Sequence, residues 1–567
     1  ALPRHRTLRA VVDWSWDLLS GAEQILARRL AVFPGGAGLA AAEQVCADEL
    51  LPAAAVLPAL SGLVDKSIIS AESPAADGPR YRMLETVRAY GLERLAEARE
   101  AERLRDAFAG YYLDLAETAD SLLRGATQVR WLRELMAEQD NLHTALRWTI
   151  SRGDGDTALR FVLALSWYWQ MRGQPGEPET LARGVLALTP GEQSSRMAEA
   201  RVVCALMAAG PAWELDAVRP ELTAALADLA ESTGDGLASH PLAAMGEPML
   251  AMYDRDPERC LATIARYTVS PDPWIRAAVA LQRGGFHAML GRYQEAESEC
   301  AVALAAFREL GDPWGIAVAL VQLTDFAMLR ADYPAATGYL EEAARQGDGV
   351  AAWGDMVYIG GKLAGIRMRT GDFAGARAEL DRAESDEARR GVRESDSVVW
   401  LGLVRAELCA SQGETAAAAR QCEKVLRWLE ARGSVFWQGL RTLTRTRLAM
   451  IMAAEGKDDR GRALLATALA EASEWIEAPV LAAVIDAIAA LASRDAGHAE
   501  LSASLLGAAH TIRGCFDEGS LDAPAARDTA RARLGPDGFR AAYDRGRALR
   551  REDMLALAAG VVAEPAG

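Results

Sequence analysis

The chain has 567 residues, of which 50% are hydrophobic and 25% charged, and its formal net charge is −17 at pH 7. Domains usually contain ~100–200 residues, so this length predicts more than one structural unit. The acidic balance argues against general binding to nucleic acids or anionic membranes, which requires a basic surface. No apolar run reaches the ~18 residues of a transmembrane helix, so we expect no membrane partner.

The N-terminus and the cysteines indicate the context of the chain. Residues 1–6 contain neither an initiating methionine nor the apolar core of a signal peptide, so we interpret residue 1 as a cut inside a longer protein. The cysteines are odd in number and widely spaced, and none forms a CxxC motif. This usage is typical of a reducing compartment, and we expect the cytoplasm. The cysteines are Cys46, Cys204, Cys260, Cys300, Cys409, Cys422 and Cys515.

The first hundred residues combine helix signals with two short strand signals. Ser20 and Glu23 form a capping box, in which the serine hydroxyl accepts from a backbone amide and the glutamate reaches back. Helices followed by a β-hairpin and another helix are typical of a winged helix. The patterns predict helices over residues 8–18, 21–30, 39–46, 54–64 and 84–98, strands over 67–70 and 80–83, and a loop over 71–79.

Many winged helices bind DNA through the helix before the hairpin, which here is the segment 54–64. This helix has no arginine, asparagine or glutamine that could read base edges. Phosphate contacts would have to come from other segments. We therefore expect a structural or regulatory winged helix and no direct DNA binding by this segment.

Several separated motifs resemble the winged-helix domain of bacterial STAND regulators, which are signal-transduction ATPases. The motifs are Arg4–Ala10, Asp13–Leu19, Leu63–Ser67 and Arg80–Arg88, and they occur in the family's order. The family includes SARP/AfsR-like and LuxR/MalT-like transcriptional regulators. In it, an NB-ARC-associated winged helix follows a nucleotide-binding domain and precedes helical repeats. The resemblance therefore implies transcription regulation, with the upstream nucleotide-binding domain of the same protein as a partner.

The motif of the ATPase itself does not occur in this chain. A P-loop needs the pattern GxxxxGK[ST], which neither Gly361–Leu363 nor Gly456–Asp458 provides. In related eukaryotic ATPases a Met-His-Asp motif brings a histidine to the ADP phosphate, whereas Leu84 stands at that position here. We expect Leu84 to be a core residue. The chain is thus predicted to be no enzyme and to hold no cofactor, while ATP or ADP would bind the full-length protein.

From about residue 102 the sequence is almost entirely helical. Residues 101–122 and 127–152 form two amphipathic segments. Asp140–Leu142 and Trp167–Trp169 also resemble the region after the winged helix in STAND regulators. Asp154–Asp156 begins like a calcium loop but is better interpreted as a turn. No histidine or cysteine spacing fits a metal site, and no Gly-x-Ser-x-Gly is present.

A period of about 40 residues appears beyond residue 270. Pro271–Trp274 recurs as Gly311–Trp314, and each aspartate can cap a helix that starts with proline. A turn also recurs, at Gly291, Ala331, Gly371 and Gly413, with degenerate copies near Gly456 and Gly497. Behind the first four turns stand a small residue and then a core residue, namely Ala296, Ala336, Ala376 and Ala418, and Cys300, Leu340, Leu380 and Cys422.

This spacing predicts tetratricopeptide-like helix pairs that stack into a superhelical solenoid, with the first helix of each pair on the concave face. Methionines, aromatic rings and charges on that face suit a protein or peptide, so we expect it to bind an unidentified protein or small-molecule effector. Several of these residues could instead pack between helices, and His287 could face a ligand or lie at the groove edge. The candidate binding residues are Met289, Asp325, Met328, Tyr358, Met368, Arg369, Trp400 and Glu407.

The C-terminal end differs in charge from the rest of the chain. Eight arginines stand between residues 523 and 551, against three aspartates there. A basic helical end could dock nucleic acid or an acidic partner. We favour a cap of the solenoid with a solvated face.

Together these patterns predict an all-α protein, a winged-helix domain with one small β-hairpin followed by a tetratricopeptide-like α-solenoid. We expect a sensor module of a STAND-type regulator, whose winged helix controls nucleotide exchange and oligomerisation of the full-length protein. A standalone scaffold that binds proteins is the alternative, and a DNA-binding protein is the weaker one. The expected parts are a winged-helix domain (1–100), a helical linker with the first repeats (101–265), repeats of about 40 residues (266–505) and a helical cap (506–567).

Overall fold

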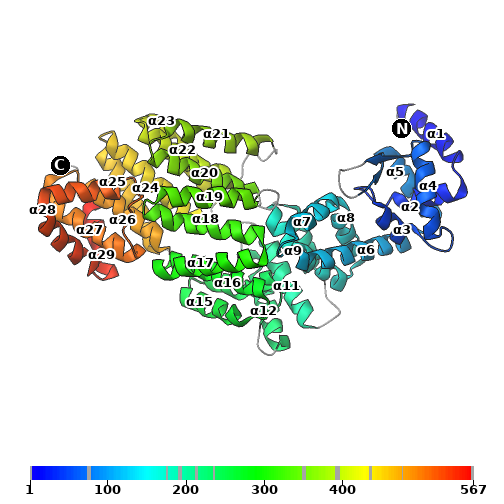
Figure 1. Ribbon diagram of the computed structural model, residues 1–567, viewed down its shortest axis with the longest axis horizontal. Coiled ribbons are helices and arrows are strands. Elements are labelled where there is room, and N and C mark those ends of the chain that lie inside the picture. Colours follow the sequence, from blue (N-terminus) through cyan, green and yellow to red (C-terminus); the bar gives the residue numbers. More distant parts are fainter. Residues whose placement is uncertain are drawn as a thin grey trace. The chain divides into compact units, whose positions relative to one another are not determined.

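A computed structural model describes residues 3–72, 78–173, 176–188, 194–210, 215–233, 237–347, 353–389, 396–432, 437–474 and 477–563. The middle of the loop predicted at 71–79 lies outside these residues. The chain divides into two compact units, both built almost entirely from helices (Figure 1). The first unit comprises Ala1–Trp169, Gln174–Ala208 and Pro220–Gly234, and the second Gln170–Gly173, Ala209–Arg219 and Asp235–Gly567.

The first unit begins with the predicted winged helix. Its hairpin pairs β1 (Ile69–Glu72) with β2 (Arg80–Met83) in antiparallel register, with Ile69 opposite Met83. The first strand starts two residues later than predicted, since the chain turns at Ser67, whose φ is 55°. The other predicted elements are confirmed. The helices are α1 (Pro3–Asp17), α2 (Gly21–Leu30), α3 (Leu39–Cys46), α4 (Ala53–Asp65) and α5 (Glu85–Glu97).

Two sequence predictions concern helix ends. The capping box of α2 is confirmed, because the Ser20 amide donates to Glu23 at 2.6 Å and the Glu23 amide donates to Ser20 Oγ at 3.4 Å. The prediction that Leu84 is a core residue is wrong, because its side chain is 71% exposed. Leu84 is the N-cap of α5, where the chain leaves the hairpin, and its backbone is extended.

Seven further helices continue the first part of the chain. The segment predicted at 127–152 is two helices, because Glu138 has φ −100° and ψ 5° and interrupts the helix. The turn at Asp154 is confirmed, since its carboxylate accepts from the Thr157 amide at 3.1 Å. The helices are α6 (Ala101–Leu122), α7 (Gln128–Ala137), α8 (Gln139–Arg152), α9 (Gly155–Arg172), α10 (Glu177–Leu186), α11 (Ser195–Ala208) and α12 (Arg219–Thr233).

The second unit consists mainly of antiparallel helix pairs (Figure 1). Short elements precede them: η1 (Leu215–Ala217), α13 (Pro241–Ala244), α14 (Gly246–Tyr253), α15 (Pro257–Ala265) and η2 (Arg266–Val269). The first helices of the pairs are α16 (Pro273–Met289), α18 (Pro313–Leu329), α20 (Trp353–Arg369), α22 (Asp396–Ser411), α24 (Gln438–Ala454) and α26 (Ala478–Ala492). The second helices are α17 (Tyr293–Leu310), α19 (Tyr333–Gly347), α21 (Phe373–Arg389), α23 (Thr415–Arg432), α25 (Asp458–Glu474) and α27 (Ala499–Arg513).

The repeat signals in the sequence act as predicted. Asp272 caps α16 by accepting from the Trp274 amide, and Asp312 caps α18 by accepting from the Gly315 amide. The predicted small and core positions behind the first four turns are all fully buried, Cys300 and Cys422 included. The turns at Gly291, Ala331, Gly371, Gly413 and Gly456 all have φ between 55° and 84°. The degenerate sixth copy differs, because a 3-10 turn, η4 (Ala496–His498), occupies its place.

The row of first helices curves round on itself. Within the row α20 contacts α22 and α24 contacts α26, and α16 of the first pair also contacts α26 of the last. The C-terminal helices α28 (Ala523–Arg547) and α29 (Arg551–Ala563) pack against α25, α26 and α27. In the described ranges, no helix combines the length and apolarity that crossing a bilayer requires.

Candidate functional site

The outer face of α4 is the surface on which a winged helix would contact DNA. Its exposed residues include Leu57, Pro58, Ser61 and Asp65, and Leu57 is 46% exposed. None of them can donate the paired hydrogen bonds that read base edges. The face is apolar with one negative charge, which suits contact with a protein better than contact with phosphates.

Basic side chains of the winged helix are paired with glutamates. Lys66 lies 2.5 Å from Glu23, Arg9 2.7 Å from Glu93 and Arg82 3.2 Å from Glu72. Arg88 and Arg94 pair with Glu85 and Glu97 on their own helix. Since each of these charges is offset locally, they do not form the basic footprint that duplex DNA attracts.

A buried charge cluster joins the winged helix to α6. The Arg29 side chain is fully buried, and it lies 2.6 Å from both Asp48 and Glu100 and donates to the Cys46 carbonyl at 2.7 Å. The Arg29 hydrogen bond lowers the pKa of Asp48 to about 2. Burial would raise the pKa of Glu100, but Arg29 and Arg28 outweigh it and lower that pKa to about 2. The cluster fixes where α6 begins.

A second polar cluster was not predicted. The buried Asn141 of α8 accepts from the Gly35 amide at 3.1 Å and donates to the Gly36 carbonyl at 2.9 Å. Beside it, Glu138 accepts from Arg80 at 2.7 Å and from Tyr112 at 2.9 Å. A buried asparagine between apolar residues is the signal that could have indicated it.

The eight predicted binding residues all lie on first helices of the repeats. Asp325 is exposed and Met368 is buried, whereas Met289, Met328, Tyr358, Arg369, Trp400 and Glu407 are half-buried. His287 is half-buried as well, and burial lowers its pKa. The structure therefore distributes them between the interior of the helix pairs and the surface that we call the first-helix face, formed by α16, α18, α20, α22, α24 and α26.

Three of the eight belong to one group around Lys362. The rings of Tyr358 and Trp400 lie 5.2 Å apart, and the Lys362 ammonium lies 4.7 Å above the Tyr358 ring. Lys362 also pairs with Asp325 of the preceding repeat. Burial alone would lower the pKa of Lys362, but Asp325 and Tyr358 raise it above its ordinary value. This lysine, which resembled a P-loop fragment only in sequence, is a structural cation.

Two others, Arg369 and Met328, contact the loop Gly514–Asp522, which joins α27 to α28 and which we call the inner loop, and Glu407 lies behind them. Arg369 Nε donates to the Gly519 carbonyl at 2.8 Å. A Cβ atom on Gly519 would clash with the Met328 carbonyl oxygen. Glu407 lies between Arg369, at 3.9 Å, and Arg447, at 3.7 Å, and Arg447 pairs with Asp522 at 3.1 Å. Sequence reasoning missed the contacts between the loop and the first helices, because Arg447 and Asp522 are 75 residues apart and Arg369 and Gly519 are 150 apart.

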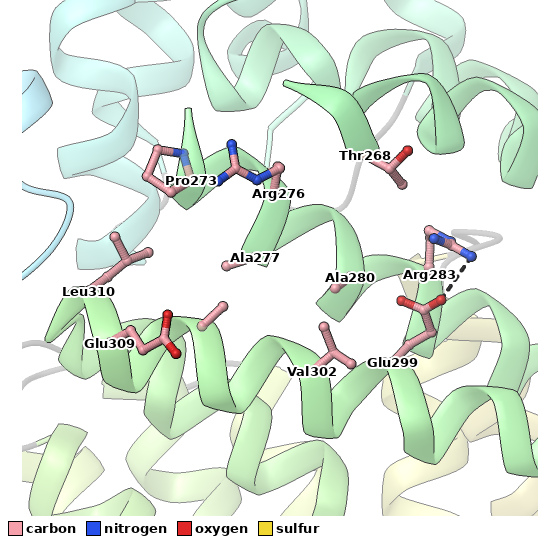
Figure 2. A pocket seen from close by; sticks show the side chains of 11 residues that line it. Thr268, Pro273, Arg276, Ala277, Ala280, Arg283, Glu299, Val302, Glu309 and Leu310 are labelled. Atoms are coloured by element: carbon pink, nitrogen blue, oxygen red, sulfur yellow. Dashed lines mark ion pairs between the residues drawn. The ribbon is translucent and has the colours of Figure 1, made fainter. Parts of the chain in front are cut away.

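A separate groove of about 600 Å³ lies between α16 and α17 (Figure 2). Ala277, Ala280 and Val302 line its middle, and an ion pair of 2.8 Å between Arg283 and Glu299 lies at one end. Its walls are mostly apolar and hold no cysteine, histidine or hydroxyl group other than Thr268. Such a groove can take up an apolar group but offers no arrangement for nucleophilic catalysis.

Comparison with known proteins bears on the winged helix first. Residues 19–96 match the family model of the winged helix-turn-helix domain. A Mycobacterium bovis protein provisionally named an HTH-type transcriptional regulator is 34% identical over 249 residues, 42% of this chain and 27% of that protein. A second, uncharacterised M. bovis protein is 38% identical over 132 residues, 23% of this chain and 33% of that protein. The chain thus spans about a quarter to a third of the length of these relatives.

Solved structures with repeats are similar to the chain at low identity. A STAND protein with a tetratricopeptide repeat sensor from Pyrococcus horikoshii has a TM-score of 0.36 and 12% identity, covering 93% of this chain and 65% of its own. The APC/C hetero-tetramer Cut9–Hcn1 has a TM-score of 0.42 and 13% identity, covering 79% and 75%. The chain is a winged-helix domain followed by a tetratricopeptide-like α-solenoid, related to HTH-type regulators.

Proposed function

We propose that this chain is the regulatory and sensor module of a STAND-type transcriptional regulator, SARP/AfsR-like or LuxR/MalT-like. In this proposal the repeats bind a protein or small-molecule signal. The winged helix then controls a nucleotide-binding domain of the same protein, which carries ATP or ADP and can assemble into oligomers. The module itself is not an enzyme, and its place of action is the cytoplasm, which agrees with free cysteines at all seven positions.

The outer face of α4 is the observation that supports this role most. A winged helix that reads DNA needs polar donors there, whereas this face presents Leu57 and Asp65, and cations of the winged helix such as Lys66 and Arg88 are paired. Other large apolar side chains on the winged helix are also exposed, among them Trp14 at 67% and Leu84 at 71%. A surface of this kind is typical of contact with another protein domain.

The test uses the full-length protein together with this chain. We expect the chain alone to show no ATP hydrolysis, and Leu57→Asp in the full-length protein to change the rate of ADP release at least threefold. Val269→Asp, which places the same charge at an exposed position of the second unit, is the matched control and should leave that rate unchanged. ATP hydrolysis by the isolated chain would contradict the proposal.

A standalone scaffold that binds proteins is the second candidate. It is favoured because the first-helix face already holds a peptide segment, the inner loop of the chain itself. In that case a Leu57→Asp change would leave every nucleotide-dependent readout unaltered. DNA binding is the third candidate, and a fluorescence anisotropy titration with duplex DNA between 50 and 200 mM salt tests it. Tight, steeply salt-dependent binding by the chain would favour it.

A further inference from the structure

The inner loop, Gly514–Asp522, touches the first helices of successive repeats in order along its sequence. The Glu518 amide donates to the Leu329 carbonyl of α18 at 2.9 Å. The next residue, Gly519, accepts from Arg369 of α20 at 2.8 Å, and Asp522 pairs with Arg447 of α24 at 3.1 Å. A nonhelical segment that follows consecutive repeats in this way lies as a bound peptide would lie on a solenoid.

The loop is held by its backbone, by an apolar anchor and by charge. Leu521 packs against the cluster of Val357, Met368 and Leu401 on α20 and α22. Burial raises the pKa of Asp517, whereas the charges of Arg513 on α27 and Arg369 on α20 and hydrogen bonds from the loop's own backbone lower it. The third acid of the loop, Glu518, instead pairs with Arg527 of α28 at 2.7 Å. The contacts to the face therefore come from the Asp522 carboxylate, one leucine and two peptide groups, and the charge of Asp517 adds an attraction to Arg369.

The face offers charges that match such a segment. Arg369 and Arg447 are each about one-sixth exposed and face the loop, while Glu407 between them holds both in place. Charge-assisted hydrogen bonds of this kind are about twice as strong as neutral ones. The group of Tyr358, Trp400 and Lys362 continues the same face, because Trp400 packs against the cluster that holds Leu521.

Gly519 shows how closely the loop approaches the face. A Cβ atom there would clash with the backbone oxygen of Met328, which cannot move without shifting the end of α18. The fit therefore depends on a glycine here, as it does at Gly514, where a Cβ atom would clash with the Gly291 carbonyl oxygen. The adjoining helices have their own contacts, since α27 and α28 pack along each other.

We propose that the first-helix face is a binding site for an extended acidic peptide segment of a partner protein, and that the inner loop occupies this site in cis. The partner segment would carry two carboxylates and a leucine at the spacing of Asp517, Leu521 and Asp522. Binding in trans displaces the loop, so the loop sets the threshold for the signal. The inference deepens the proposed function and rests on it, since there the repeats receive the signal.

The test measures binding of a fluorescein-labelled peptide with the sequence of residues 514–522, made with Cys515→Ser. A tethered loop competes at an effective concentration of about 1 mM, so the free peptide should bind the native chain weakly. Gly519→Val is expected to displace the inner loop from the first-helix face, and it changes no residue of that face. We expect this variant to bind the peptide at least tenfold more tightly, by fluorescence anisotropy, with faster hydrogen exchange at the Glu518 amide.

Matched variants separate the proposal from a general loosening of the fold. Gly338→Val adds the same side chain at an exposed glycine of α19 with open space around it, and should bind like the native chain. Adding Arg369→Gln to Gly519→Val should weaken peptide binding at least tenfold. A peptide with Asp517→Asn and Asp522→Asn should also bind at least tenfold more weakly.

A folded Gly519→Val chain that exposes its loop but does not bind the peptide would overturn the proposal, and the loop would then be a structural plug. If Gly519→Val does not fold, the comparison is made with Leu521→Ala, where an unchanged peptide affinity overturns it equally. If the peptide does not bind but Leu57→Asp still changes the rate of ADP release, the peptide site is contradicted while the proposed function stands. The reverse result, tight peptide binding without any effect on ADP release, identifies a standalone scaffold.

Discussion

At the residue scale, the Arg29 side chain is the centre of the buried charge cluster of the winged helix. It is fully buried and satisfied by two carboxylates and one carbonyl. Removing one member of a buried charge cluster leaves the others desolvated without a partner, which costs ~3–5 kcal/mol. An exposed pair such as Arg9–Glu93 contributes ~0–1 kcal/mol.

We therefore expect Arg29→Ala to lower the free energy of unfolding of the first unit by ~3–5 kcal/mol. Urea unfolding followed by circular dichroism at pH 7 measures this change. Arg9→Ala is the control and should cost less than ~1 kcal/mol. Equal effects of the two substitutions would show that Arg29 does not hold α6 in place.

The same cluster predicts how stability depends on pH. The pKa values of Asp48 and Glu100 are about 2 in the folded chain, against ordinary values of 3.8 and 4.5. A lowered carboxyl pKa contributes stability that is fully present above the unfolded value and is lost as the pH falls through the folded value. Stability of the first unit should thus be constant above about pH 5 and fall by ~2–3 kcal/mol per carboxyl between about pH 4.5 and 2.

Unfolding curves recorded from pH 7 to pH 2 test this dependence. In Arg29→Ala the acid loss should be smaller by about half or more, because the pKa values return towards their ordinary range. A native chain whose stability rises as the pH falls from 5 to 3 would contradict the assignment.

At the element scale, the repeated motif at Pro271–Trp274 and Gly311–Trp314 places an aspartate N-cap before α16 and before α18. The two aspartates differ in the contacts that they make. Asp272 accepts from the Trp274 amide at 2.8 Å, as an N-cap does. Asp312 accepts from the Gly315 amide at 2.7 Å and also from the Trp274 indole at 2.6 Å, and it is fully buried. The second aspartate therefore joins two repeats, whereas the first caps its own helix.

We expect Asp312→Ala to destabilise the repeats by ~2–4 kcal/mol, since it loses the cap and leaves a buried indole N–H without this acceptor. Asp272→Ala, the matched change in the other copy, should cost ~1 kcal/mol. Differential scanning calorimetry of both variants gives the comparison. The same cost at both positions would mean that the contact with Trp274 contributes nothing beyond the cap.

The elements themselves were largely predictable, because their signals are local. Capping at Ser20, the proline-started helices of the repeats and the left-handed turn at Gly371 depend on residues within one or two turns of the chain. The break at Glu138 and the exposure of Leu84 were not predictable. Both depend on how the hairpin packs against α8 and α5, and no sequence signal within a few positions of either residue indicates this packing.

At the scale of the whole molecule, the chain consists of two compact units. Arg29 belongs to the first and Asp312 to the second, and they share no hydrogen-bonding partner. Substitutions without shared partners add to within ~0.5 kcal/mol. The double variant Arg29→Ala with Asp312→Ala should therefore lose the sum of the single losses.

Calorimetry of the double variant checks this additivity. Each single substitution should shift one part of the unfolding transition and leave the other unchanged, because multidomain chains unfold in more than one step. A coupling above ~1 kcal/mol would show that the two units unfold as one cooperative body.

The sequence alone determined the repeat period, the winged helix and the first helices on which the candidate residues stand, since helical periodicity and turn chemistry act over short distances. It could not determine what those residues contact. Arg369, chosen as a residue for a partner, binds the chain's own Gly519, which lies 150 positions away. Only the curvature of the stacked repeats brings the loop between α27 and α28 onto their first helices. Tertiary structure thus decided that the predicted binding face is occupied.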